Sequence, residues 1–256
     1  MIYCTTVYRG ITQGRHGILY EVDIETGKYK ILLDYDDEID YSGRGGDRGL
    51  RGIARINDNL YVCTSKSVLK LDLIGNILNR LEHPYLGWLH EIAVDHTGFS
   101  VVSTMYDSIL HYNIGENTWD SIIHVNENGD LQYFPYAVEL TPSNKWHLNS
   151  ISKHTISGLR LPFILPSKLE IPADTHNTRI INGKLFYNDT KKNTIVFGNK
   201  SYIFKDHTFL RGVSFTENRI IIGQCPASLH VFDYDLNLIN SINLCPDENV
   251  SIQSIL

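Results

Sequence analysis

Residues 50–73, LRGIARINDNLYVCTSKSVLKLDL, contain the unit from which the rest of the chain can be read. A polar tip leads into a short apolar strand, and polar turns separate this strand from two more apolar strands. The same layout recurs at 89–114, 175–199 and 210–234, and each copy is followed by the start of a fourth strand. Four antiparallel strands in a unit of about 40 residues are typical of one blade of a β-propeller.

The two ends of the chain fit the same layout. The N-terminal segments MIYCTT (1–6), GILYEVDIETG (17–27) and KYKILLDYD (28–36) match the second, third and fourth strands of a blade that lacks its first strand. The C-terminal segment ENVSIQSIL (248–256) is suited to supply that strand. Closure by strands from both termini removes exposed sheet edges. We therefore expect the whole chain, 1–256, to form a single all-β propeller domain.

The number of blades follows from the leading segments, which start near residues 50, 89, 148, 175 and 210 and at the C-terminus. Their spacing is uneven. The part that follows 148 is short for three strands and contains prolines, which suit edges and loops. We therefore predict a six-bladed propeller with a reduced fourth blade and an inserted loop at about 127–145. A five-bladed ring is the alternative.

Composition excludes several classes of protein. The 256 residues are 42% hydrophobic, and 29 acidic against 23 basic residues give a net charge of −6. This balance argues against nucleic acid or an anionic membrane as a partner, since both require a basic surface. No apolar span of about 20 residues and no secretory signal is visible, so we expect a cytoplasmic protein with reduced cysteines. Cys4, Cys63 and Cys225 share one repeat position, which predicts buried structural side chains.

Polar residues of the repeats fall at equivalent positions near the start of each leading strand, which lines the central channel of a propeller. One aligned position carries Arg51, His90, Asn149, His176 and Arg211. The next position carries Gly52, Glu91, Ser150, Asn177 and Gly212. We expect these side chains to converge on one small volume, with neighbouring polar groups within reach: His147, Arg179 and Gln253, and at the rim Asp47 and Arg48.

This set of residues predicts a site that binds an anion and transfers protons. Guanidinium groups bind carboxylate, phosphate or sulfate through paired hydrogen bonds. Histidine and glutamate act as acid and base near neutral pH. The substrate-binding candidates are Arg51, Asn149, Asn177, Arg179 and Arg211. The catalytic candidates are His90, Glu91, His147 and His176. Trp88 and Trp146 each precede a channel strand, and they either form an apolar lip or pack between blades.

Two other interpretations of the same residues stay open. The polar groups can form a structural plug in which Arg51 and Arg211 pair with Glu91. Histidine, glutamate and asparagine side chains can also hold a divalent metal. A single carboxylate is few for a hard cation, and the two nearby arginines repel it. The sequence therefore leaves the cofactor undefined, with a divalent metal as the candidate.

The blocks WHLNSI, HNTRIINGKLFYND and FLRGVSFTENRIIIGQ, within about 85–225, resemble a poorly characterised bacterial propeller family. Members of that family carry W-H-x-N, P-H-[ST]-P-R-x-x-[DN]-G-x-[LV] and G-[FY]-x-R-G-[LV] blocks. The matching residues of this chain are His147, Asn149, His176, Arg179, Arg211 and Gly212. Thr175 and Thr178 replace the two prolines of the second block, and the blade after His147 is short. The resemblance implies a propeller and brings no established activity.

A looser resemblance is to six-bladed propellers of the gluconolactonase and strictosidine-synthase type. Those propellers hold calcium or another divalent ion in the channel with Glu, Asn and Asp ligands. Glu91 and Asn149 are similar to two of these ligands. No aspartate occupies an aligned ring position, so the ligand set that the resemblance implies is incomplete.

Two functions are compatible with these observations. The first is a small-molecule pocket in the central channel, with the protein acting as a hydrolase, lyase or epimerase on an anionic or sugar-like metabolite. The second is a non-catalytic propeller that binds a protein or a carbohydrate. An aromatic loop containing Tyr133, Phe134 and Tyr136 favours the second function. The sequence does not indicate the oligomeric state.

Overall fold

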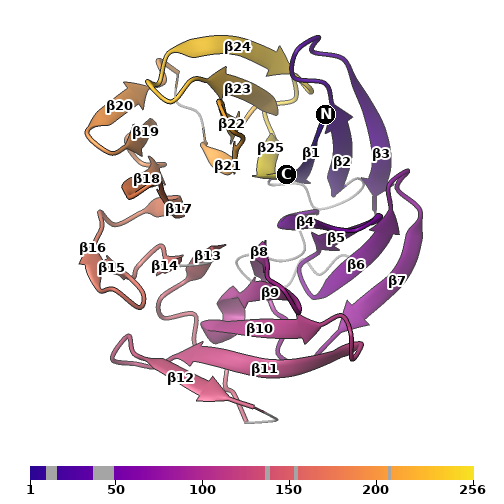
Figure 1. Cartoon of the computed structure of the whole chain (residues 1–256), viewed down its shortest axis with the longest axis vertical. Helices are drawn as coiled ribbons and strands as arrows, with labels where there is room; N and C mark the ends of the chain where they lie inside the picture. Colours follow the sequence, from indigo (N-terminus) through magenta and orange to yellow (C-terminus); the bar gives the residue numbers. More distant parts are fainter. Residues whose placement is uncertain (10–15, 37–48, 136–138, 153–154, 207–208) are drawn as a thin grey trace.

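β-Strands surround an open centre in the computed structural model of the chain (Figure 1). The structure describes residues 1–9, 16–36, 49–135, 139–152, 155–206 and 209–256. Within these residues it contains 25 β-strands and a single short 3₁₀ helix, η1 (Thr104–Tyr106). The all-β propeller that the repeats predict is therefore confirmed. No helix in the described part of the chain is long and apolar enough to cross a membrane.

The sheets divide the ring into sectors, which we number one to six in chain order. From the centre outward, sector one contains β25 (Val250–Ile255), β1 (Ile2–Tyr8), β2 (Gly17–Val22) and β3 (Tyr29–Tyr35). Sector two contains β4 (Ile53–Ile56), β5 (Asn59–Cys63), β6 (Ser67–Asp72) and β7 (Ile77–Glu82). Sector three contains β8 (Leu89–Val94), β9 (Gly98–Ser103), β10 (Ser108–Asn113), β11 (Thr118–Val125) and β12 (Leu131–Phe134).

The second half of the chain completes the ring. Sector five contains β17 (Thr175–Ile181), β18 (Lys184–Asp189), β19 (Thr194–Phe197) and β20 (Lys200–Ile203). Sector six contains β21 (Arg211–Phe215), β22 (Ile220–Gln224), β23 (Ser228–Phe232) and β24 (Leu238–Asn243). In each of these sheets the strands follow one another antiparallel, as a meander requires.

Sector four is the reduced blade expected between residues 148 and 174. It consists of β13 (Leu148–Ser152), β14 (Thr155–Gly158), β15 (Phe163–Ile164) and β16 (Leu169–Glu170). These strands form two two-stranded sheets, which a bridge between Ile156 and Leu165 connects. The ring therefore has five complete blades, and a reduced sixth sector lies among them. The expectation of a plain loop at 127–145 is wrong in part, because β12 pairs with β11 there.

The chain closes the ring by pairing its two ends, as the sequence predicts. β25 pairs antiparallel with β1, and this pairing joins Cys4 to Ile255 and Val7 to Ser251. The backbone N–H of Tyr3 also donates to the carbonyl oxygen of Leu256 over 3.0 Å. The N and C labels lie beside each other in Figure 1. The first sheet thus depends on both termini, and the C-terminal strand covers the edge of β1.

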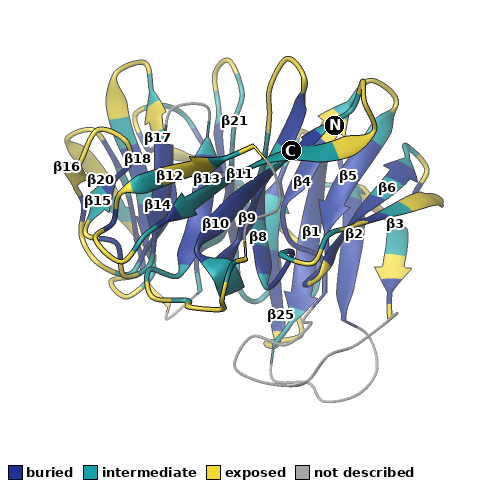
Figure 2. Cartoon of the chain, turned by 90° about the horizontal axis from the view of Figure 1, so that it is seen from below, coloured by how far each residue is buried: buried dark blue, intermediate teal, exposed yellow. Residues whose placement is uncertain are grey.

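Apolar side chains fill the spaces between neighbouring sectors. Leu19 and Leu50 pack with Leu60 and Leu69 between sectors one and two, and all four are fully buried. Figure 2 shows the strands largely buried and the exposed residues concentrated in the connecting loops and outer strands. Burial of one such leucine contributes about 1.5–3 kcal/mol. The core therefore consists of layers between sheets, and the central channel is left to polar groups.

Two of the three cysteines predicted to be buried are so. Cys4 and Cys63 have no exposed surface, and burial raises the pKa of both thiols. Cys225 is only half-buried, because it lies just after the end of β22. All four cysteines are free. A reactive role is excluded for Cys4 and Cys63, since a buried thiol with a raised pKa is inert.

A bulge interrupts the leading end of the innermost strands. The pairing register shifts between Leu89 and Ile92 in β8, and between Arg211 and Val213 in β21. β13 and β17 carry similar shifts. A bulge turns the side chains beside it out of the regular alternation. Gly212 has φ +64°, a conformation that favours glycine. A glycine at this position therefore allows the backbone to take the shape of the bulge.

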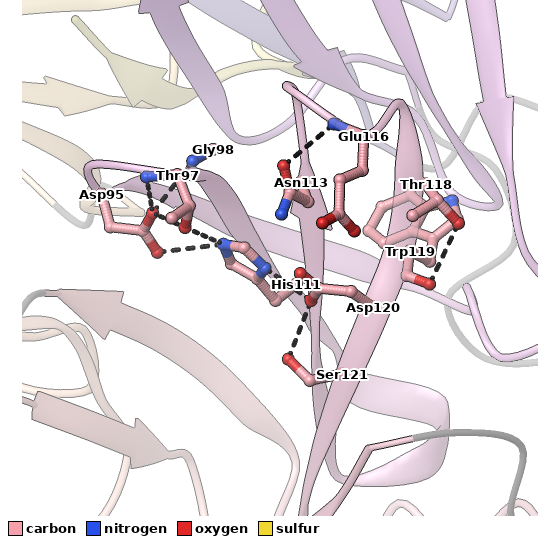
Figure 3. A network of polar contacts seen from close by, with 10 residues as sticks. All are labelled: Asp95, Thr97, Gly98, His111, Asn113, Glu116, Thr118, Trp119, Asp120 and Ser121. Atoms are coloured by element: carbon pink, nitrogen blue, oxygen red, sulfur yellow. Dashed lines mark hydrogen bonds and ion pairs between the residues drawn. The ribbon is translucent and has the colours of Figure 1, made fainter.

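A polar cluster fastens the outer part of sector three, as Figure 3 shows. The Nδ1 atom of His111 lies 2.8 Å from a carboxylate oxygen of Asp120, and its Nε2 atom lies 3.1 Å from Asp95. Burial opposes ionisation of Asp95, but hydrogen bonds from Thr97 and Gly98 outweigh it and lower its pKa to about 2. His111 thus ties β10 to β11 and to the turn before β9.

Candidate functional site

A cavity of about 520 Å³ lies at the end of the channel where the innermost strands begin. Its walls come from the leading ends of all six sectors and from the loops beside them. The lining residues are Val7, Arg9, Arg51, Trp88, His90, Asn144, His147, Leu159, Arg160, Asp174, His176, Thr190, Lys191, Phe209, Arg211 and Gln253. A volume of this size falls within the range of pockets for small organic molecules.

Two rings of side chains form the cavity. The inner ring contains four residues that the sequence alignment places at one position, namely Arg51, His90, His176 and Arg211. The outer ring contains the residues two positions earlier in four sectors, namely Trp88, His147, Asp174 and Phe209. In the alignment of the repeats, these four residues share one position. They precede β8, β13, β17 and β21, so the alternation within the strands does not place their side chains.

Left-handed backbone explains how the outer ring is aimed. Trp88, His147 and Asp174 have φ values of 51°, 51° and 65°. This conformation is uncommon for residues with a side chain, and it occurs where the surrounding structure enforces it. The left-handed backbone at Trp88 and His147 cannot be predicted from the sequence, because neither residue type favours it. Only the asparagine and glycine positions of the repeats carry a compositional signal for it.

Asp107 holds the segment that carries His147. Its fully buried carboxylate accepts hydrogen bonds from the Ser143 hydroxyl at 2.7 Å and the Trp146 backbone N–H at 3.1 Å. The Nδ1 atom of His147 lies 2.9 Å from the side-chain oxygen of Asn144, so the ring donates there. His147 also contacts His90 edge to face, with ring centres 5.6 Å apart. The segment before β13 is therefore a fixed wall of the cavity.

His90 is a neutral hydrogen-bond acceptor. Nη1 of Arg51 lies 3.1 Å from its Nε2 atom, and a guanidinium group only donates. The ring proton of His90 is therefore on Nδ1. Burial lowers the pKa of His90 well below its usual value, and the charges of Arg51 and Arg211 lower it further. At neutral pH this histidine carries no charge.

His176 has a ring nitrogen available for chemistry. Its Nδ1 atom is 2.8 Å from the Thr190 hydroxyl, and the ring also hydrogen-bonds to the backbone of Asp174. Nε2 is buried and has no hydrogen-bond partner among the described residues. A proton on Nδ1 satisfies both contacts and leaves the lone pair on Nε2. Burial and the charge of Arg211 lower the pKa of His176, so the ring is neutral.

Arg211 is a guanidinium without a carboxylate partner among the residues that the structure describes. Its Nε atom is buried with no hydrogen-bond partner, and the group lies over the ring of Phe209 at 4.5 Å. Arg9 lies over the same ring at 3.7 Å. Burial lowers the pKa of Arg211, and the charges of Arg51 and Arg9 lower it further. An arginine side chain keeps its proton in proteins. The lowered pKa therefore means that the charge of Arg211 lies in an energetically unfavourable place.

The charge of Glu91 raises the pKa of Arg211, but Glu91 makes no hydrogen bond to Arg211, because four other donors occupy its carboxylate. Arg179 donates to Oε2 at 2.8 Å, and the Ser150 hydroxyl and Ile151 backbone N–H donate to the same atom at 3.1 and 3.0 Å. Asn177 donates to Oε1. We call Glu91, Ser150, Asn177 and Arg179 the polar plug. It joins sectors three, four and five beneath the cavity.

The candidate residues predicted from sequence thus separate into two groups. Five of the nine line the cavity: Arg51, His90, His147, His176 and Arg211. The other four, Glu91, Asn149, Asn177 and Arg179, do not. Asn149 is buried and donates to the carbonyl oxygen of Thr175 at 3.3 Å. The structural plug considered from sequence exists, but Arg179 pairs with Glu91 in place of Arg51 and Arg211.

Other sequence candidates have mixed outcomes. Gln253 lines the cavity, as does Trp88, whereas Trp146 lines a separate groove. Asp47 and Arg48 lie outside the described residues, as does Tyr136 of the aromatic loop. Tyr133, the neighbour of Phe134 in that loop, is 68% exposed on the outermost strand of sector three.

The described lining carries a strong positive charge. Five cationic side chains face one carboxylate, that of Asp174. At the mouth, Arg160 donates to the Asn144 carbonyl oxygen at 2.9 Å, and Lys191 lies 3.9 Å from Asp174. The cations at the floor are more deeply placed, and Arg51 is only 7% exposed. No group of three or more His, Cys, Asp or Glu side chains in the described chain is arranged to hold a metal ion.

Comparisons with known proteins show the fold. No family model matches the sequence, and no curated protein matches it. A solved nidogen–laminin complex is similar in structure, with a TM-score of 0.61, 10% identity and coverage of 100% of this chain and 97% of that chain. A streptogramin B lyase is similar with a TM-score of 0.54, 12% identity and coverage of 82% and 88%. These neighbours are β-propellers.

A third similar structure is a catalytically inactive histidine-to-alanine variant of virginiamycin B lyase from Staphylococcus aureus with quinupristin. Its TM-score is 0.50 and its identity 11%, with coverage of 83% of this chain and 75% of that chain. Propellers similar to this chain therefore include a lyase. At these identities the likeness extends to the fold alone.

Proposed function

We propose that the cavity binds a small organic anion, with Arg211 as its principal partner. The observation that carries this proposal is a buried guanidinium Nε with no hydrogen-bond partner, in a group with no carboxylate partner among the described residues. A charge in such a place costs free energy unless a counter-charge is supplied. The hydrogen bonds of the polar plug occupy the carboxylate of Glu91, so we infer that a ligand supplies the counter-charge.

The neighbouring histidines suit proton transfer to or from such a ligand. Nε2 of His176 offers a lone pair beside the cationic floor. A carboxylate bound to Arg211 would place its adjacent carbon near this base. His176 would take a proton from that carbon, and the electron pair left behind would be stabilised by the guanidinium charge. Expulsion of a leaving group from the next carbon then gives elimination, whereas epimerisation would require a second proton donor on the opposite face of the carbon.

The similarity to a streptogramin B lyase supports elimination as the first reaction to test, because it shows that related propellers accommodate a lyase. The resemblance to the uncharacterised bacterial propeller family supports the location. Three of its matched residues, His147, His176 and Arg211, line the cavity. Two others, Asn149 and Arg179, stabilise the channel below it.

Binding is tested by thermal unfolding of the purified protein with sulfate, phosphate, citrate or acetate at constant ionic strength. An anion present at 100 times its dissociation constant adds about 2.7 kcal/mol to the stability of the folded state. Arg211→Gln should abolish this gain. Arg55→Gln is the matched control, because Arg55 is exposed on β4 outside the cavity. Equal stabilisation of both variants would contradict the proposal.

Catalysis is tested by incubating the protein with a panel of sugar acids in D₂O. Deuterium incorporation next to the carboxylate, or ultraviolet absorbance from a new double bond, would report proton abstraction. His176→Asn should lose this activity and keep anion binding. If no acid exchanges or reacts while the anions still bind, the protein is a binding propeller and His176 has no role as a base.

A further inference from the structure

Trp88 differs from the other two tryptophans of the chain. The indole N–H of Trp119 donates to the carbonyl oxygen of Glu82 at 2.9 Å, and that of Trp146 donates to Asn126 at 2.8 Å. Trp88 makes neither a hydrogen bond nor a ring contact with any residue that the structure describes. It is half-buried and lines the cavity. The indole of Trp88 thus presents a large aromatic surface to the cavity.

The backbone that carries Trp88 is rigidly supported. The N–H of Gly87 donates to the Ser103 hydroxyl at 3.1 Å, and the Gly87 carbonyl accepts from the N–H of Met105 at 3.1 Å. A Cβ atom at Gly87 would lie 2.8 Å from the Met105 side chain. Close packing of this segment against η1 fixes the position from which the indole extends. The backbone position of Trp88 in the cavity wall is therefore fixed.

Trp88 and Phe209 are the two aromatic side chains of the described cavity wall other than histidine, and their contacts differ. They belong to sectors three and six, which lie opposite each other across the ring in Figure 1. Phe209 is engaged by the guanidinium groups of Arg9 and Arg211, so it supports the cationic side. The indole of Trp88 makes no hydrogen bond or ring contact with the residues that the structure describes. The cavity thus has an anion-binding side on sector six and an aromatic platform on sector three.

The remaining lining side chains indicate what lies between these two sides. Asn144, Thr190 and Gln253 line the cavity, and each already makes one side-chain hydrogen bond, to His147, His176 and Ser251 in turn. An amide or hydroxyl group can make more than one hydrogen bond, so each can also bind a ligand. Such groups bind hydroxyls, and the face of an indole packs against the C–H face of a sugar ring or against another aromatic ring. A bare inorganic anion would occupy only the floor of a cavity of about 520 Å³.

We propose that the natural ligand is a sugar acid, with its acid group on Arg211 and its ring face on Trp88. This inference rests on the proposed function, because it takes Arg211 as the anion site. It assigns Trp88 as the residue that makes the site specific for a ring-bearing anion. An aryl acid shares the same requirement for a flat face, and the experiment distinguishes it.

The test is calorimetric titration with four probes: glucuronate, benzoate, acetate and glucose. The wild-type protein should bind glucuronate at least tenfold more tightly than acetate or benzoate, and glucose weakly. Trp88→Leu should lose the advantage of glucuronate over acetate while its affinity for acetate stays the same. Trp119→Phe is the matched control and should retain the advantage. Trp88→Tyr, which keeps an aromatic face, should retain most of it.

Tryptophan fluorescence gives a second measurement that needs no loss of Trp88. Glucuronate should change the emission of the wild-type protein and of Trp119→Phe, and acetate should not. Equal affinity for glucuronate and acetate, or an unchanged preference in folded Trp88→Leu, would overturn the inference and leave the anion site standing. Tighter binding of benzoate than of glucuronate would overturn the assignment to a sugar. Failure of every anion to bind would overturn the proposed function as well.

Discussion

Arg211 shows at the scale of one residue how a binding site opposes stability. The folded protein keeps this guanidinium beside Arg51 and Arg9, where burial and like charge disfavour it. We therefore expect Arg211→Gln to be at least as stable as the wild-type protein without ligand, with a gain of about 1 kcal/mol. Urea unfolding in a low-salt buffer without multivalent anions measures it. A loss of stability of similar size would mean that Arg211 has a structural role.

Glu91 is the opposite case, because its charge is fully paired. Glu91→Gln removes the partner of Arg179, whose side chain is only 17% exposed. Breaking one side of a buried pair is expensive, so we expect a loss of about 3 kcal/mol in the free energy of unfolding. Glu21→Gln is the matched control. Glu21 pairs with the exposed Lys30, and its replacement should cost less than about 1 kcal/mol. Similar losses in both variants would contradict the buried plug.

At the scale of the elements, the bulged leading ends of the inner strands decide which residues meet. The repeat alignment singles out Arg51, His90, His176 and Arg211, and these four residues line the cavity. It also predicts Asn149 and Asn177 there, because it assumes that equivalent positions point the same way. Asn149 is equivalent to these four residues but does not line the cavity, and Asn177, which follows His176 by one residue, donates to Glu91 in the polar plug.

The outer ring of the cavity cannot be predicted from the sequence either. Trp88 and His147 precede their strands in left-handed backbone, which no local sequence signal marks for these residue types. Trp88 lines the cavity and Trp146 lines a separate groove, and the sequence does not distinguish the two. What separates them is the pairing of Trp146 with Asn126 across a loop, a contact that depends on the folded chain.

Asp107 gives a prediction at this scale. Its carboxylate anchors the segment before β13 through Ser143 and Trp146. Asp107→Ala should cost about 3 kcal/mol, because the Ser143 hydroxyl and the Trp146 backbone N–H lose a charged, buried acceptor. It should also weaken anion binding, since the segment carries His147. Asp58→Ala, at an exposed turn, should have little effect. Normal stability with Asp107 removed, measured by urea unfolding, would show that the segment is held by other contacts.

At the scale of the whole molecule, the fold is the part that sequence predicts best. The four-strand layout repeats with strong apolar periodicity, and the missing first strand of the N-terminal blade has an obvious substitute at the C-terminus. β12 could not be predicted, because its four residues extend the edge of a blade that is already complete. The blade count was ambiguous because sector four is held by a single bridge between its two small sheets.

The histidine cluster gives the pH dependence of the whole fold. The pKa values of His90 and His176 are lowered in the folded state by burial and nearby arginines. The unfolded chain binds protons at the ordinary value near 6.5, and the folded chain does not. Stability should therefore fall as the pH decreases from about 7 to about 5, and His176→Asn should reduce the slope. Urea midpoints measured across this range check it, and a flat profile in the wild-type protein would argue against neutral buried histidines.

The central claim is that the cationic floor of the cavity is an anion site. Crystals grown with selenate, whose selenium scatters anomalously, test it most directly. We predict an anomalous peak within hydrogen-bonding distance of the Arg211 guanidinium, at the axis of the ring. Crystals that show selenate only on the outer surface, with none at Arg211, would contradict the account.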